Sequence, residues 1–243
     1  STRNSSGGSG LVWHGIPFSL NAELISAWRP VVKLTISGVQ PHWGGYSAGM
    51  GLSFDFLVFS NGGAPALRRP LDVSDAQAFV RRLYPRTAYE HIETARLLEV
   101  ARQPRGRIAI GVFAGGVLVA TKDAHLYDPD TLHRRYLRLK EWTELQLLTS
   151  ASVSNMFAYG RWQAGEMVRC LSVNPVAGVR RDWGEPSVFE GGKPVSEDRW
   201  LELSNAALES SLQLDGDAVS RFPGYVDWED VVLHVFARPV SPA

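Results

Sequence analysis

The sequence contains a single cysteine, Cys170, among 243 residues. One thiol can form neither an internal disulfide nor a zinc site built on several cysteines, so the cysteine content gives no sign of an oxidising compartment. The six histidines include no pair at the spacing of helical metal ligands. We therefore expect no metal and no other cofactor.

The sequence also lacks net charge and long apolar segments. Lysine and arginine total 25, as do aspartate and glutamate, which argues against a nucleic-acid binder recognised by its bulk charge. The apolar stretch at residues 11–20 is interrupted by His14, Gly15 and Pro17, so neither a signal peptide nor a membrane span is expected. These absences predict a soluble cytoplasmic protein that binds neither nucleic acid nor membrane.

Charge is distributed unevenly along the chain. Residues 1–49 hold four charged side chains, eight glycines and eight serines, whereas residues 50–243 hold the other 46 charged side chains. The run Ser5–Gly10 consists of serine and glycine alone, which is typical of a flexible linker. We expect residues 1–49 to be a poorly ordered extension and residues 50–243 to form a single domain.

Apolar patterning after residue 50 predicts strands. Residues 54–59 form an apolar run, and residues 107–114 and 117–121 flank Gly115 and Gly116 as the two strands of a hairpin. A three-stranded meander is expected within residues 145–173, with its last tight turn at residues 163–165. A final strand is expected at residues 231–237.

Helical spacing and capping residues predict helices between these strands. They are expected between Ser74 and Pro85, at residues 94–101, after Asp128–Pro129, and at residues 205–213. Hairpin-paired strands with helices between the groups indicate an α+β fold. The expected architecture is a mostly antiparallel sheet built from hairpins, with three or four helices packed against it.

Several segments together resemble one known family. Residues 157–190 carry the most specific motifs: a tryptophan, a glycine turn, an Arg-x-Leu-Ser strand, a Pro-x-x-Gly break and a Gly-Glu-Pro segment followed by Phe-Glu. Shorter matches lie at residues 56–59, 65–68, 80–85 and 111–113. Residues 50–238 are thus similar to a family of uncharacterised actinobacterial proteins, a domain of unknown function. The resemblance supports a domain boundary near residue 50 and implies no reaction.

Gly45, Tyr46, Ser47, Ala48 and Gly49 match the G-x-S-x-G pattern of a nucleophile elbow. An elbow requires a strand before its serine and a helix after it. Here a proline- and glycine-containing segment precedes the motif, and the segment that follows is expected to be a strand. A serine hydrolase is therefore disfavoured, and a glycine-rich linker is expected instead.

The segment 180–190 combines tryptophan, arginine and carboxylates, as binding surfaces often do. With two residues of the preceding strands it supplies the candidate residues for binding a ligand or partner: Trp162, Arg169, Asp182, Trp183, Glu185 and Glu190. The same residues could instead form a structural salt-bridge cluster that holds the loop to the sheet, and this alternative is favoured.

A second charged group is the basic helix face of Arg134, Arg135, Arg138 and Lys140. Such a face could meet phosphate. Runs of this kind are usually solvated helix faces, however, and the neutral total charge argues against nucleic acid. A solvated surface is therefore expected.

Three functions remain open from the sequence. The leading hypothesis is a non-enzymatic domain that binds an unknown protein or small molecule near segment 180–190. The second is an enzyme that uses dispersed acid–base groups, with Arg169, Glu185 and Glu190 as candidates; a pocket joining these three would favour it. The serine hydrolase is third. An exposed patch at Trp162 or Trp183 would favour a protein partner.

Overall fold

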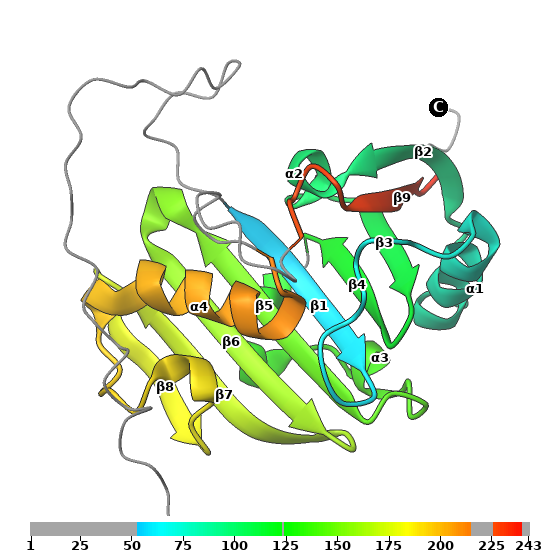
Figure 1. Cartoon of the computed structure of the whole chain (residues 1–243). Helices are drawn as coiled ribbons and strands as arrows, with labels where there is room; N and C mark the ends of the chain where they lie inside the picture. The colour runs from blue at the N-terminus through cyan, green and yellow to red at the C-terminus, as the bar shows by residue number, and fades with distance from the viewer. Residues whose placement is uncertain (1–52, 123, 215–225, 240–243) are drawn as a thin grey trace, which may run out of the picture. The chain divides into compact units, whose positions relative to one another are not determined.

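The computed structural model describes residues 53–122, 124–214 and 226–239. The whole extension expected at residues 1–49, including the Gly45–Gly49 motif, therefore lies outside the described residues. Within them, nine strands form one sheet in the order β2-β9-β3-β4-β1-β5-β6-β7-β8 (Figure 1). Every neighbouring pair is antiparallel, as the sequence predicts.

Groups of strands are separated along the chain by helices and 3-10 turns. The strands are β1 (Phe54–Ser60), β2 (Glu90–Arg96), β3 (Arg107–Phe113), β4 (Gly116–Thr121), β5 (Glu144–Ala151), β6 (Met156–Gln163), β7 (Glu166–Asn174), β8 (Gly178–Gly184) and β9 (Val232–Ala237). The α-helices in the described residues are α1 (Val73–Leu83), α2 (Leu97–Val100), α3 (Arg134–Leu137) and α4 (Trp200–Leu212). Short 3-10 turns include η2 (Ala124–Tyr127), η3 (Pro129–Thr131) and η5 (Val188–Glu190).

Two segments expected to be helical differ in the structure. Residues 94–96 belong to β2, where Thr94 lies opposite His234 of β9 and their side chains are hydrogen-bonded at 3.1 Å. Helix α2 is therefore only four residues long. After Asp128, a 3-10 turn precedes the four-residue helix α3 in place of one continuous helix.

Two further elements correct the sequence prediction. Residues 178–184, which include the first five residues of the expected binding segment 180–190, form β8 because their backbone pairs with β7. Helix α4 begins at Trp200, five residues before the expected start, and ends at Leu212. Both differences depend on packing and pairing with distant residues.

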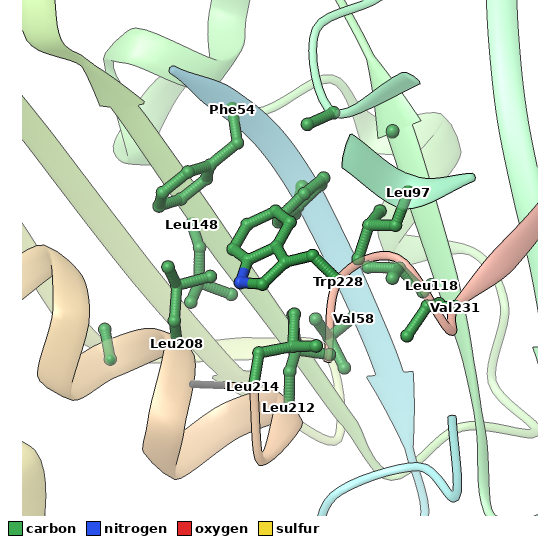
Figure 2. Packing of buried hydrophobic residues seen from close by; sticks show 14 of the residues in the cluster. Phe54, Val58, Leu97, Leu118, Leu148, Leu208, Leu212, Leu214, Trp228 and Val231 are labelled. Atoms are coloured by element: carbon green, nitrogen blue, oxygen red, sulfur yellow. The ribbon is translucent and has the colours of Figure 1, made fainter. Parts of the chain in front are cut away.

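Both faces of the central part of the sheet are buried, each under a different set of elements. On one face Phe54, Phe56 and Val58 of β1 pack with α2, α4 and Trp228 (Figure 2). On the other face Leu57 and Phe59 pack with residues of α1, α3 and η2. All seven residues of β1 are consequently buried, which explains why its sequence is a continuous apolar run.

Asp55 is the charged exception within buried β1. It is 1% exposed, and neither carboxylate oxygen has a hydrogen-bond partner within the described ranges. Thr149 lies opposite Asp55 in the pairing with β5. Burial raises the pKa of Asp55 to about 6, although the charges of Arg102 and Lys122 and the hydroxyl of Thr149 oppose the rise.

This raised pKa predicts a pH-dependent stability. Because the folded state binds the Asp55 proton more tightly than the unfolded state, whose pKa is 3.8, the contribution is full below about pH 4 and is lost as pH rises through 6. The difference corresponds to about 3 kcal/mol. We expect Asp55→Asn to raise the free energy of unfolding by up to about 3 kcal/mol at pH 7.5 and to change it little at pH 4.

Urea denaturation at the two pH values measures this difference. Asp75→Asn, on the exposed first turn of α1, is the control and should change stability little at either pH. Equal gains for Asp55→Asn at both pH values, or no gain at pH 7.5, would contradict the interpretation.

Candidate functional site

A cleft of about 620 Å³ opens on the α4 face of the sheet, where β5 begins and β6 ends. Its floor is formed by the two strands, and its walls by the loop after β1, the segment of η5 and the end of α4. The lining includes Gly62, Gly63, Thr143, Glu144, Gln146, Tyr159, Arg161, Gln163, Ser187, Val188, Phe189 and Ser210.

A chain of hydrogen bonds runs along the floor. Arg161 donates from Nε and Nη2 to Oε2 of Glu144, at 3.0 and 2.8 Å. Gln146 Nε2 donates to Oε1 of Glu144, and Ser211 of α4 donates to Gln146 Oε1, each at 2.5 Å. The register of β5 and β6 places Gln146 opposite Arg161, with Glu144 two residues away on the same face.

The charge of Arg161 is stabilised while part of its guanidinium remains accessible. Burial acts to lower its pKa, but the hydrogen bonds and charge of Glu144, together with the charge of Glu185, outweigh burial and raise it. The Arg161 side chain is 33% exposed. Its Nη1 has no hydrogen-bond partner among the residues described, so it can donate to a molecule in the cleft.

Tyr159 and the η5 segment form an adjoining wall. The ring of Phe189 meets that of Tyr159 edge-on, with centroids 4.8 Å apart. Ser187 Oγ donates to the Tyr159 hydroxyl at 3.5 Å. Burial raises the pKa of Tyr159 to about 12. The phenol therefore stays protonated near neutral pH and can serve as a hydrogen-bond donor.

Four of the six candidate residues form one cluster beside this wall, centred on the buried side chain of Arg169. Arg169 Nε and Nη2 donate to the two carboxylate oxygens of Glu190, at 2.9 and 2.5 Å. Its Nη1 donates to the Trp183 carbonyl at 2.9 Å, and Asp182 Oδ1 lies 2.7 Å from Nη2. Arg169 and Glu190 are 1% and 2% exposed. This arrangement is the structural salt-bridge cluster that the sequence analysis favoured.

The cluster also shapes the cleft. The backbone N–H of Ser187 donates to Glu190 Oε1 at 2.7 Å, so the carboxylate that neutralises Arg169 also fixes the start of η5. The cleft lining includes Ser187 and Phe189 but not Arg169 or Glu190. The ion pair therefore holds the wall in position from behind.

The other two candidates, Trp162 and Glu185, lie apart from the ion pair of Arg169 and Glu190. Trp162 is 3% exposed and packs on the opposite face of the sheet, where a Cβ on Gly160 would lie 2.5 Å from its ring. Its ring is thus core, which corrects the grouping of Trp162 with a surface site. Glu185 is exposed, and its N–H donates to the Val168 carbonyl at 3.1 Å. Trp183 is 43% exposed.

Sequence reasoning missed Glu144, Gln146, Tyr159 and Arg161. A signal for them exists, because the two members of each polar pair stand two residues apart in one strand and therefore share one face. What the sequence does not give is the register that brings the two pairs together.

No group of three or more His, Cys, Asp or Glu side chains is placed to hold a metal ion in the described part of the chain. Nor do residues 53–122, 124–214 and 226–239 contain a helix long and apolar enough to cross a membrane. The absence of a cofactor and the cytoplasmic location stay predictions.

Comparison with known proteins places the chain in a family. The chain belongs to a family of unknown function, DUF6928, whose model matches residues 56–236. The match confirms the resemblance inferred from the motifs, while the actinobacterial origin stays a prediction. No curated protein and no solved structure matches the chain. Both the cleft and the Arg169 cluster lie within the matched residues.

The buried ion pair predicts a large loss of stability when its carboxylate is removed, because Arg169 would stay buried without compensation. We expect Glu190→Ala to lower the free energy of unfolding by about 3–5 kcal/mol. Asp182→Ala should cost less than about 1 kcal/mol, since the Asp182 side chain is 42% exposed. Chemical denaturation of the two variants provides the comparison, and equal losses would show that Glu190 has no special role.

Proposed function

We propose that this member of the family is a binding domain that holds a small, neutral, polar molecule in the cleft over β5 and β6. The observation that carries the proposal is the accessible guanidinium of Arg161 at the cleft floor. One edge of it is fixed by Glu144, and Nη1 remains available. The proposal keeps the non-enzymatic binding role expected from the sequence, within the predicted α+β architecture.

The hydrogen-bonding groups of the cleft indicate the chemistry of the ligand. Arg161 Nη1 and the Tyr159 hydroxyl can donate, whereas both carboxylate oxygens of Glu144 already accept hydrogen bonds. A matching ligand therefore brings acceptors, such as an amide carbonyl or hydroxyl oxygens. Phe189 and Val188 offer an apolar edge beside them.

Charge and size restrict the ligand further. Glu144 neutralises Arg161, and the nearby charge of Glu185 adds a second carboxylate, so the floor does not favour an anion. The volume of about 620 Å³ lies within the range common for small-molecule sites. A neutral molecule the size of a sugar or a short amide fits both properties.

The enzymatic alternative receives less support. It depends on Arg169, Glu185 and Glu190 acting together, but the carboxylate of Glu190 is engaged by Arg169 and by the backbone of Ser187. Neither Arg169 nor Glu190 lines the cleft. Buried groups that bind each other so fully are poorly placed to exchange protons with a substrate.

Two neutral probes and one anionic probe test the proposal by NMR. N-acetylglucosamine and N-acetylglycinamide carry the expected acceptors, and N-acetylglycine is the anionic counterpart of the second. We expect the neutral probes to bind with a millimolar Kd and to shift backbone resonances at residues 144–146, 159–163 and 187–189. N-acetylglycine should bind more weakly than N-acetylglycinamide.

Variants connect this binding to Arg161. Arg161→Ala should weaken binding of the neutral probes about tenfold, since a hydrogen bond from a charged donor contributes about 1.5–3 kcal/mol. The control is Arg107→Ala in β3, which removes the exposed ion-pair partner of Glu93 in β2. It should leave binding unchanged. The proposal fails when neither neutral probe shifts the cleft resonances, or when both variants bind equally well.

A further inference from the structure

A second surface, independent of the cleft, gathers positive charge at the C-terminal end of α1 and around α3. Six side chains there are exposed or half-buried, and none takes part in an ion pair among the residues the structure describes. We call this set the arginine surface; it consists of Arg81, Arg86, Arg134, Arg135, Arg138 and Lys140.

Contacts between the two elements bring these residues onto adjoining segments. The Arg135 guanidinium lies over the ring of Tyr84, the C-cap residue that follows α1, at 4.9 Å from its centroid. The hydroxyls of Tyr84 and Tyr136 are 3.0 Å apart. Arg82 of α1 forms an ion pair with Glu141, just after α3. The end of α1 is therefore fixed beside α3.

Neighbouring acids do not neutralise the arginine surface. Glu141 is the single acidic residue in segments 81–86 and 134–141, and it pairs with Arg82. Asp128 and Asp130, which precede α3, pair with Arg180 and Arg181. Six positive charges thus gather in a chain whose total is zero. Positive side chains near the C-terminal end of a helix stabilise its dipole, but this explains only one or two of the six charges, those in or next to the last turn of α1.

We propose that the arginine surface binds the phosphate backbone of a nucleic-acid duplex without reading its sequence. Five of its six cations are arginines, whose planar donors match phosphate oxygens in pairs. The rings of Tyr84 and Tyr136 are 7% and 1% exposed, so they give unpaired bases no stacking platform. Helix α3 has four residues, which is too short for a recognition helix lying in the major groove.

An anionic membrane is the competing partner for such a surface, and the apolar residues argue against it. Membrane-surface segments combine basic residues with large apolar side chains that enter the lipid. None of the exposed large hydrophobic residues described in the structure lies in segments 81–86 or 134–141. The backbone of a duplex requires no such insertion, because counterion release drives its binding.

Fluorescence anisotropy with a labelled 20-base-pair DNA duplex tests the proposal. We expect a micromolar Kd at 50 mM NaCl and about a hundredfold weaker binding at 200 mM, as about four phosphate contacts would give. Unrelated duplex sequences should bind equally. A wild-type protein that leaves the duplex free at 50 mM NaCl overturns the proposal, as does one that sediments with anionic vesicles but ignores the duplex.

Matched charge reversals locate the binding surface. Arg134→Glu with Arg138→Glu should weaken duplex binding at least tenfold at 50 mM NaCl and flatten its salt dependence. Arg69→Glu with Arg105→Glu changes two exposed arginines outside the surface and should alter the Kd less than twofold.

Thermal unfolding checks that both double variants fold. Should the first variant be unstable, Arg86→Glu with Lys140→Glu takes its place with the same expected loss. Equal weakening by the surface and control variants would mean that bulk charge drives the binding, and the assigned surface would be wrong.

Discussion

The buried ion pair between Arg169 and Glu190 fixes the wall of the cleft. The side chain of Glu190 binds Arg169 of β7 and the backbone N–H of Ser187 at the start of η5. The backbone carbonyl of Glu190 accepts a hydrogen bond of 3.1 Å from Nη2 of Arg199, the residue just before α4. A buried pair is tolerable only when further hydrogen bonds satisfy its remaining polar groups. Here the Trp183 carbonyl and the Ser187 N–H do so. Phe189 is thereby held against Tyr159, and the cleft keeps its shape.

Two arginines with similar contacts on the same face of the sheet differ in how deeply they are buried. Arg169 and Arg161 lie opposite each other in the pairing of β6 with β7, and each binds a glutamate through Nε and Nη2. The Arg169 side chain is 2% exposed, whereas that of Arg161 is 33% exposed. Three donor nitrogens of Arg169 are occupied, but Nη1 of Arg161 is available. The first arginine is therefore structural and the second can bind.

The sequence predicts those parts of the fold whose signals are local. The apolar run of β1, the Gly115–Gly116 hairpin and the meander of β5 to β7 all follow from short patterns. Most residues of the edge strands β2 and β8 are exposed, and neither strand is an apolar run. Pairing with β9 and β7 makes them strands. Residue type pointed to Arg169 and Glu190, but the cleft depends on the register of β5 and β6, which no local pattern encodes.

Total charge is also a poor predictor of a binding surface, because it sums side chains that folding places on different parts of the molecule. A net charge of zero is compatible with a local excess of positive charge at the arginine surface. The cleft opens on the α4 face, whereas α1 and α3 pack on the opposite face. Since the buried sheet lies between them, a duplex on the arginine surface would leave the cleft open. The two proposed binding activities can therefore coexist in one domain and be separated by substitution.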